Sequence, residues 1–207
     1  MGRRLARQIQ QEYEALAPVY DRRWRRYLDA SLDATFARLP PTAGIHSILD
    51  IGCGSGELLR RLHLQSPHLK LTGADASLSM LIIAHRKLNG TAQLCNAAAE
   101  ALPFSANSFD LVVSTSVLHY WPDPAQVLAE TRRVLTPAGR LVLTDWCGDY
   151  LSCRLIAAGL RLARRPLAQL YRSTECRRLL QQNGFRVERL ERYKISRSWG
   201  LMTAVAV

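Results

Sequence analysis

Five short apolar runs separated by helical segments constrain what this chain can fold into. Helical periodicity predicts helices near 55–65, 77–88 and 123–135, whereas the link between the third and fourth runs contains Pro103 and is expected to be a loop. Near-continuous apolar strands that alternate with helices indicate a parallel sheet covered on both faces. The predicted strands are HSILDI (46–51), LKLTGAD (69–75), AQLCNAA (92–98), SFDLVVSTS (108–116) and GRLVLTDW (139–146).

Further elements are predicted on either side of this alternating block. Residues 1–40 carry apolar side chains at helical spacing, and the Pro40-Pro41 pair ends that pattern. We predict an α/β doubly wound, Rossmann-like fold with added N-terminal helices and a helical insertion after strand five. The expected organisation is an N-terminal helical segment at 1–40 followed by one compact domain at 41–207. The elements after strand five are helices near 149–164 and 173–183 and strands within 185–196 and 199–207.

The composition is that of a globular protein. Of the 207 residues, 48% are hydrophobic and 22% are charged, which suits one domain whose core needs neither disulfides nor metals. No apolar run approaches the ~18 residues of a membrane-spanning helix, and no signal-peptide apolar region follows the basic start. The five cysteines lack regular spacing, so we expect no disulfide framework and no metal site. A cytoplasmic location is the expectation.

The net charge of +11 is concentrated towards the C-terminus. Residues 151–207 carry twelve basic and three acidic side chains, whereas 41–150 are nearly neutral. Three interpretations stay open: solvated helix faces, contact with an anionic substrate or membrane surface, and RNA binding. An apolar stripe within 149–164 would suit peripheral membrane contact, although we favour packing of this stripe on the sheet. The stripe consists of Leu151, Leu155, Ala158 and Leu162.

A glycine turn follows the first predicted strand. The strand ends at Asp50 and continues into Gly52, Gly54 and Gly56. Glycines let the chain turn sharply and let backbone groups approach a ligand, and the next helix begins with free N–H groups. Dinucleotide-binding turns space their glycines as G-x-G-x-x-G, whereas this turn is G-x-G-x-G. The carboxylate of Asp50 suits a ligand with an ammonium group better than one with phosphates.

A second acid ends the second predicted strand. Asp75 lies 19 residues beyond Gly56, where its carboxylate could accept hydrogen bonds from both hydroxyls of a ribose. Both features fall at the carboxyl ends of strands, where open α/β sheets bind ligands. The alternatives are a tight turn that holds no ligand, and helix capping by Asp75 or Ser77.

These residues resemble the motifs of class I S-adenosylmethionine-dependent methyltransferases. LDIGCGSGE (49–57) is similar to the first motif of the family, and GADASLSML (73–81) to the second. The segments at 13–21 and 99–124, YEALAPVYD and AEALPFSANSFDLVVSTSVLHYWPDP, resemble the small-molecule type 11 branch, which includes the quinone-biosynthesis enzymes. The resemblance covers about residues 13 to 146. It implies S-adenosyl-L-methionine as cofactor and seven strands in the order 3-2-1-4-5-7-6, with the last pair antiparallel.

The resemblance also implies roles for residues at the strand ends. Asp50 and the glycines would hold the methionine end, Asp75 would bind the ribose, and Ser116 would lie near the sulfonium. Tyr20 lies in the segment that covers the cofactor in the family. The implied cofactor-binding residues are Asp50, Gly52, Gly54, Gly56, Asp75, Ala76, Ala99, Glu100, Ser116 and Tyr20.

The sequence departs from the family pattern at Ala98. The family usually has an acid there that receives the adenine amino group, so we expect either a lower cofactor affinity or a substitute role for Glu100. Tyr13 is in the same N-terminal segment as Tyr20, and we expect it to serve ordinary helix packing.

His119 and Tyr120 follow the fourth strand, where the methyl group would be delivered, and are the candidate catalytic residues. His119 could be a general base that deprotonates the acceptor, or it could shape the pocket or cap the next helix. Holding both reactants in line is worth ~7–11 kcal/mol, whereas a positioned base adds about 3–5 kcal/mol. Orientation of the reactants therefore ranks above acid–base chemistry.

The leading hypothesis is methyl transfer to a small organic acceptor, which could be hydrophobic or anionic. Nucleic-acid amino-methyltransferases usually carry an Asn/Asp-Pro-Pro-aromatic motif after strand four to receive a flipped base, whereas this chain has STSVLHYW at 114–121. Nucleic acid is therefore less favoured. The alternatives are an RNA or protein methyltransferase that docks through the basic C-terminal quarter, and a non-catalytic scaffold that binds the cofactor. The sequence does not predict an oligomeric state.

Overall fold

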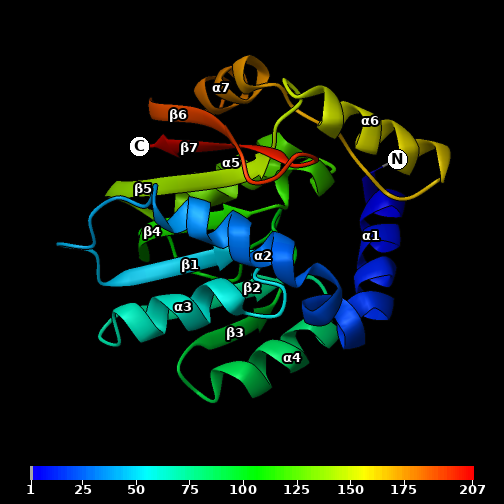
Figure 1. The fold of residues 1–207 in the computed structure, drawn as a ribbon. Coiled ribbons are helices and arrows are strands. Elements are labelled where there is room, and N and C mark those ends of the chain that lie inside the picture. The colour runs from blue at the N-terminus through cyan, green and yellow to red at the C-terminus, as the bar shows by residue number, and fades with distance from the viewer. Residues whose placement is uncertain (1) are drawn as a thin grey trace.

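The computed structural model describes residues 2–207, which form one sheet with helices on both faces (Figure 1). The sheet of this part has seven strands in the order β3-β2-β1-β4-β5-β7-β6. Strands β1 to β5 are parallel, and β7 pairs antiparallel with β5 and β6, so the predicted Rossmann-like topology is confirmed. The strands are β1 (Ser47–Ile51), β2 (Lys70–Asp75), β3 (Gln93–Asn96), β4 (Phe109–Thr115), β5 (Leu135–Trp146), β6 (Val187–Lys194) and β7 (Gly200–Ala206).

Helices connect these strands, and the helices predicted after residue 41 are present with ends that differ by at most two residues, whereas the N-terminal helical segment ends at Phe36, before Pro40. The link that contains Pro103 is a loop, as expected. The α-helices are α1 (Gly2–Leu16), α2 (Tyr20–Phe36), α3 (Glu57–Gln65), α4 (Leu78–Leu88), α5 (Pro124–Val134), α6 (Leu151–Leu162) and α7 (Ser173–Gln182), and the short 3-10 helices are η1 (Ala17–Val19) and η2 (Leu118–Tyr120).

Strand β5 begins earlier than the prediction of 139–146. It starts at Leu135, directly after α5, and Leu135 pairs with Phe109 before a bulge shifts the register to Leu111 and Arg140. The added residues 135–138 carry no apolar alternation. The extension is visible only in the backbone pairing.

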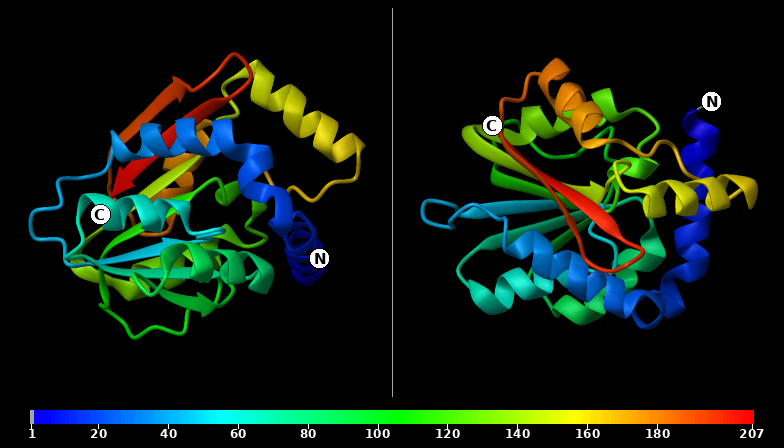
Figure 2. Two further views of the ribbon diagram at one scale, coloured as in Figure 1. Left: turned by 60° about the horizontal axis from the view of Figure 1, so that its bottom comes forward. Right: turned by 45° about the horizontal axis from the view of Figure 1, so that its top comes forward.

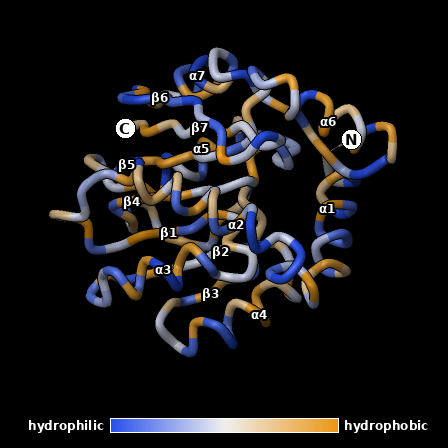
Figure 3. The backbone as a smooth tube through the Cα atoms, viewed as in Figure 1, coloured by the Kyte–Doolittle hydropathy of each residue, from blue (hydrophilic) through white to orange (hydrophobic). Residues whose placement is uncertain are grey.

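The sheet separates two hydrophobic clusters because successive strand residues point to opposite faces. On β4, Leu111 and Val113 belong to the cluster covered by α2, α3 and α4, whereas Val112 belongs to the cluster covered by α5 and α7. Hydrophobic residues follow the central strands β1 and β5, while the edge strand β6 is hydrophilic (Figure 3). The doubly covered sheet explains the near-continuous apolar runs.

Helix α2 lies on one face of the sheet. Leu32 is buried in the cluster formed with α3 and α4. The Thr35 hydroxyl donates to Oγ1 of Thr144 on β5 at 3.1 Å, and the Thr144 and Thr203 hydroxyls are 2.8 Å apart. The second half of the N-terminal segment thus shares the core of the sheet.

Helix α1 crosses the carboxyl ends of the parallel strands (Figures 1 and 2). Glu14 accepts hydrogen bonds from the backbone N–H groups of Leu78 and Ser79 at the start of α4. Glu12 forms an ion pair with Arg165, just beyond α6. The helix is therefore held by polar contacts at two places and spans the region between them.

Helix α6 does not pack its apolar stripe on the sheet, contrary to our expectation. Leu151, Leu155 and Leu162 are 63%, 64% and 88% exposed. The helix packs through Cys153 and Ala157 instead, because these small side chains allow a close approach to the start of β7. Within residues 2–207, no helix is long and apolar enough to cross a membrane.

Gly200, at the start of β7, has no room for a side chain. A Cβ there would lie 2.0 to 2.6 Å from three ring atoms of Tyr150. We predict that Gly200→Ala lowers the free energy of unfolding by about 1–3 kcal/mol, the usual cost of overpacking, as measured by urea denaturation. Gly159, inside α6, has open space around it, so Gly159→Ala should instead raise stability by roughly 0.5–1 kcal/mol. Equal effects of the two substitutions would contradict the packing argument.

Candidate active site

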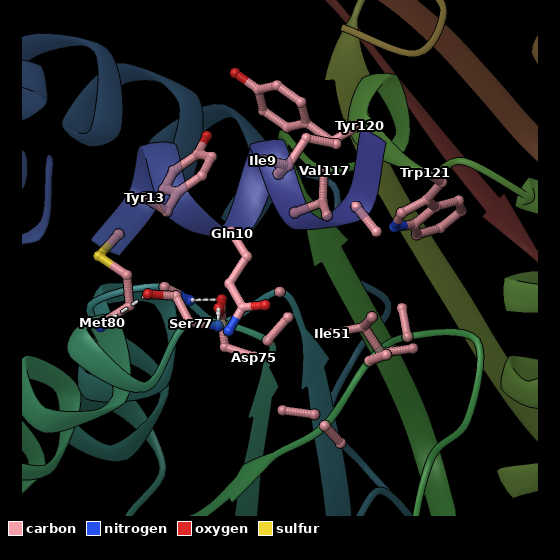
Figure 4. Close-up of a pocket in the computed structure, with 18 of the residues that line it drawn as sticks. Ile9, Gln10, Tyr13, Ile51, Asp75, Ser77, Met80, Val117, Tyr120 and Trp121 are labelled. Carbon is pink, nitrogen blue, oxygen red and sulfur yellow. Dashed lines mark hydrogen bonds between the residues drawn. The ribbon is translucent and has the colours of Figure 1, made fainter. Parts of the chain in front are cut away.

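A cavity of about 160 Å³ lies at the carboxyl ends of β1, β2 and β4 (Figure 4). Its floor is formed by the turns after these strands, and α1 covers it with Ile9, Gln10 and Tyr13. The loop after β4 closes one side with Val117 and Tyr120. Open α/β sheets bind their ligands at this edge, and the cavity is where the sequence predicted the cofactor.

The glycine turn requires residues without a Cβ. Gly52 and Gly54 both line the cavity and have left-handed φ values of +74° and +52°. A Cβ on Gly52 would lie 2.6 Å from Cγ2 of Val117, so the turn passes tightly beneath the loop after β4. Any other residue at Gly52 would meet both a backbone penalty and a clash.

Gly56 lies outside the cavity wall. It precedes α3 with φ +76°, and a Cβ there would come within about 3.0 Å of Leu88 and Ala84 on α4. The third glycine therefore permits the close packing of α3 against α4. The turn is positioned partly by this helix contact.

Asp75 ties two turns together on the cavity wall. Its Oδ2 accepts a hydrogen bond from the Gly54 N–H at 2.8 Å, and its Oδ1 accepts one from the Ser77 N–H, also at 2.8 Å. Burial raises the pKa of this carboxyl, while the two backbone donors act in the opposite direction. Each carboxylate oxygen keeps a second lone pair, so Asp75 can still accept hydrogen bonds from a ligand.

Asn96 is a residue that our sequence reasoning missed. Its Nδ2 donates to the backbone oxygens of Asp75 and Ala76 at 2.9 and 3.1 Å. It thereby fixes the loop that carries Ala76 on the cavity wall. The available signal was a polar residue at the end of the third apolar run.

Asp50 is buried directly before the glycine turn. It is 1% exposed, and within residues 2–207 its Oδ1 has no hydrogen-bond partner. Burial and, secondarily, the charge of Asp75 raise its pKa to about 8. An unpaired buried carboxylate is costly, and a ligand ammonium group would relieve that cost. The orphaned oxygen and the glycine turn thus fit the amino-acid end of a methionine cofactor.

Ser116 ends β4 in a strained conformation. Its φ is +60°, which is unusual for a residue with a Cβ. Its N–H donates to the Thr144 oxygen at 2.8 Å. Its hydroxyl lies 2.6 Å from the Tyr27 hydroxyl, which also accepts from Nε1 of Trp146 at 2.8 Å. Such strain costs about 1–3 kcal/mol and collects at functional sites; here it sets Ser116 on the cavity wall.

His119 and Tyr120 are adjacent in sequence but occupy different places. Tyr120 lines the cavity, whereas His119 is 2% exposed and lies outside the cavity wall. His119 stacks on Trp146 with ring centroids 4.2 Å apart. Its Nδ1 is 2.6 Å from Oδ1 of Asp145. Its Nε2 is buried without a partner in the described chain.

The Asp145 contact defines the state of the imidazole. The carboxylate also accepts the backbone N–H of His119 at 3.1 Å and that of Trp146 at 2.5 Å. A carboxylate at Nδ1 favours the tautomer with its proton there, which leaves the lone pair on Nε2. Asp145 was absent from our predicted site, although it stands one residue before the end of the fifth apolar run.

The remaining residues predicted to bind the cofactor also line the cavity. Ala99 and Glu100 line it together with Ala97 and Ala98, so the wall is apolar where the family usually has an acid. Tyr20 also lines the cavity.

Tyr13 was expected only to pack between helices, and that expectation is wrong. Tyr13 lines the cavity and contacts Tyr20 and Tyr120, with ring centroids 5.9 and 5.6 Å apart. Because α1 crosses the strand ends, a ring that looks like helix packing in the sequence reaches the cavity.

Comparison with known proteins agrees with this geometry. The family model described as a methyltransferase domain matches residues 49–143. The ubiquinone/menaquinone biosynthesis C-methyltransferase of Desulfotalea psychrophila is 36% identical over 128 residues, 60% of this chain and 48% of that protein. The malonyl-[acyl-carrier protein] O-methyltransferase of Alcanivorax borkumensis is 41% identical over 108 residues, 51% of this chain and 37% of that protein. The chain therefore spans half the length or less of these two relatives.

A solved structure shares the fold over nearly the whole chain. The S-adenosylmethionine-dependent methyltransferase of Thermotoga maritima has a TM-score of 0.76 at 19% identity, covering 94% of this chain and 98% of that one. The family model places a methyltransferase domain at residues 49–143, and the strand order and the glycine turn are those of class I S-adenosylmethionine-dependent methyltransferases, whose cofactor is S-adenosylmethionine. Among these enzymes, the chain resembles the ubiquinone and menaquinone C-methyltransferases.

Asp50 makes the stability of the cofactor-free protein depend on pH. The ordinary pKa of its carboxyl is 3.8, and burial raises this pKa to about 8 in the folded protein. Between these values folding takes up a proton, so the free energy of unfolding falls as pH rises, by up to about 1.4 kcal/mol per pH unit. We expect urea denaturation between about pH 5 and 8 to show this fall, and Asp50→Asn to remove most of it, since the raised pKa of Asp75 contributes the rest.

Asp110 provides the matched control. Its carboxylate accepts hydrogen bonds from His46 and Ser47, which outweigh burial and lower its pKa. Asp110 is therefore ionised throughout this pH range, and Asp110→Asn should leave the pH slope unchanged. A slope that persists undiminished in Asp50→Asn would contradict the assignment.

Proposed function

We propose that this methyltransferase acts on a small organic acceptor. The observation that carries the proposal is the enclosure of the cavity: α1 covers it with Ile9, Gln10 and Tyr13, and Val117 and Tyr120 close the side at β4. A macromolecular substrate needs an open cleft at the reacting group, whereas a small acceptor can enter a covered one. The mostly apolar wall further favours an acceptor with a hydrophobic body.

The cofactor would lie across the strand ends with its amino-acid part at β1. Asp50 would pair with the ammonium group, and the backbone at Gly52 and Gly54 would leave room for the methionine portion. Asp75 would accept the ribose hydroxyls while keeping its hydrogen bond from the Gly54 N–H. The adenine would lie against Ala76 and the alanine-rich stretch at 97–99, with Glu100 as the nearest acid of that wall.

When bound, S-adenosylmethionine supplies a methyl carbon on a positive sulfur, and the acceptor provides the electron pair for the new bond while losing a proton. Ser116 and Tyr120 line the part of the cavity where this carbon would point. Helix α1 would act as a lid that excludes water and holds the two reactants in line, which is the largest contribution expected from the protein.

His119 would take up the proton released by the acceptor indirectly, through a side chain on the cavity wall, because His119 itself lies outside that wall. Asp145 fixes the imidazole through Nδ1, and the buried Nε2 lacks a partner within residues 2–207. The carboxylate would also stabilise the imidazolium that forms. Tyr120, between His119 and the cavity, would orient the acceptor, since its ring centroid is 4.1 Å from that of His119.

The names of the relatives favour the same substrate class. One is named for quinone biosynthesis and another for an acyl-carrier-protein ester, so small organic groups are methylated in both. An RNA or protein methyltransferase that docks through basic residues 151–207 is the second candidate. Several arginines there already pair with acids, including Arg192 with Asp149 and Arg165 with Glu12, which weakens the case for a dedicated polyanion surface.

We expect His119→Gln to lower kcat for the acceptor by roughly 10²- to 10⁴-fold without changing the affinity for S-adenosylmethionine, because a base acts only on the acceptor. Asp145→Asn should lower kcat less and shift the pH profile, since it removes the charge that supports the imidazolium. Steady-state kinetics across pH, with cofactor affinity measured by calorimetry, test this pair. Unchanged kcat in His119→Gln would remove the role as base.

The substrate class is tested with cofactor carrying a labelled methyl group. The protein is incubated with separated small-molecule, RNA and protein fractions of a cell extract, and we expect label in the small-molecule fraction. Label only in RNA or protein would contradict the proposal.

Calorimetry should also show that Asp75→Asn weakens cofactor binding at least about tenfold, whereas Asp123→Asn, at the α5 cap, leaves it unchanged. If the wild-type protein did not bind S-adenosylmethionine, the result would favour a protein that has lost the use of this cofactor.

A further inference from the structure

The acids of α2 pair with basic residues of the neighbouring helices. Asp21 pairs with Lys87 at 2.7 Å, and Asp29 and Asp33 both pair with Arg61 at 2.5 and 2.7 Å. Arg22 and Arg25 line a hollow together with Asp21 and Asp29, whereas Arg23 and Arg26 do not.

Four exposed arginines of α2 have no carboxylate partner within residues 2–207. Arg23 lies over the ring of Trp24, with its guanidinium carbon 5.8 Å from the ring centroid. Arg26 follows one helical turn after Arg23, so both project along the same side of the helix. The four are Arg22, Arg23, Arg25 and Arg26.

These arginines border a groove of about 510 Å³ between α2 and the β6–β7 hairpin. The right view of Figure 2 shows the hairpin passing over α2. Three aromatic rings line the groove, Trp24 and Tyr27 from α2 and Trp199 from the hairpin. The Trp199 centroid lies 5.1 Å from that of Tyr27 and 6.3 Å from that of Trp24. The groove thus combines flat apolar surfaces with unpaired positive charge.

One side chain separates this groove from the cofactor cavity. Tyr27 lines the groove with its ring, and its hydroxyl lies 2.6 Å from that of Ser116, which lines the cavity. Trp146 donates to the same hydroxyl and stacks on His119, whose Nε2 is free within the described chain. The groove therefore leads towards the end of β4, where methyl transfer is proposed.

We propose that this groove binds the methyl acceptor and that the acceptor is a planar aromatic compound with an anionic substituent. This inference rests on the proposed function. The aromatic part packs against the Trp24 and Trp199 rings, which meet edge to face at 69°, and the anionic group pairs with Arg23 and Arg26, whose planar forks match a carboxylate or phosphate. The end of the aromatic body beside Tyr27 receives the methyl group once the Tyr27 side chain, which separates the groove from the cavity, has turned away from Ser116.

Single-stranded RNA could use the same combination of stacking and positive charge. The groove favours a small molecule because the Tyr27 side chain alone lies between its inner end and Ser116. A polymer would instead need an extended basic track, and Asp21 and Asp29 lie on the far side of α2. The experiment must therefore distinguish binding of RNA from binding of a small molecule.

The test compares two probes of the same shape, 2-naphthoate and its neutral analogue 2-naphthamide. With the full chain saturated with S-adenosylhomocysteine, we expect 2-naphthoate to quench tryptophan fluorescence and to bind about tenfold more tightly than 2-naphthamide. The double variant Arg23→Gln/Arg26→Gln should lose this preference while its affinity for 2-naphthamide stays unchanged. Trp199→Leu should weaken both probes, because it removes a stacking surface.

Arg178→Gln, on the exposed side of α7, is the matched control and should bind both probes as the wild type does. Cofactor binding is measured separately in every variant, so its loss would count against the proposed function and not against the groove. Normal cofactor binding with no binding of 2-naphthoate would overturn the inference. So would an unchanged preference in the Arg23/Arg26 variant, or binding of a single-stranded RNA oligonucleotide in place of 2-naphthoate.

Discussion

The two hydrogen bonds accepted by Asp75 hold the site together. One carboxylate binds the Gly54 N–H of the turn after β1, and also the Ser77 N–H at the start of α4. Parallel strands bring the two turns to the same edge, where the Gly52 and Cys53 N–H groups donate to the Ala74 oxygen, and the Asp75 side chain adds a link to Gly54 and Ser77. Charge-assisted hydrogen bonds to backbone N–H groups are among the stronger ones in proteins. Asp75 thus orders the turn and then offers its remaining lone pairs to a ligand.

Three buried polar groups near this edge lack a hydrogen-bond partner within residues 2–207: Oδ1 of Asp50, Nε2 of His119 and Nε1 of Trp121. Burying unpaired polar groups costs free energy, which neighbouring packing must offset. A bound cofactor and acceptor would supply missing partners. The unpaired groups lower the stability of the protein without ligands, and bound ligands would recover that stability.

Aromatic packing links the parts of the site that come from distant sequence positions. Tyr27 joins α2 to Ser116, Trp146 joins Tyr27 to His119, and Trp199 brings in the β6–β7 hairpin. Ser116 and Trp146 therefore meet at the Tyr27 hydroxyl, and His119 and Trp199 pack against the Trp146 ring. The sequence did not single out Tyr27, because contacts across 89 or 119 positions leave no local signal.

The amino-acid sequence by itself determined the sheet, its helices and the glycine turn with its two acids, because hydrophobic periodicity and backbone sterics act between near neighbours in the chain. The tertiary structure decided which side chains face the cavity. In the folded protein Tyr120 and Tyr13 line the cavity, whereas His119 lies outside the cavity wall. The apolar stripe of α6 is exposed. These outcomes depend on how α1, α6 and the hairpin cross the strand ends, which is set by packing between residues far apart in the sequence.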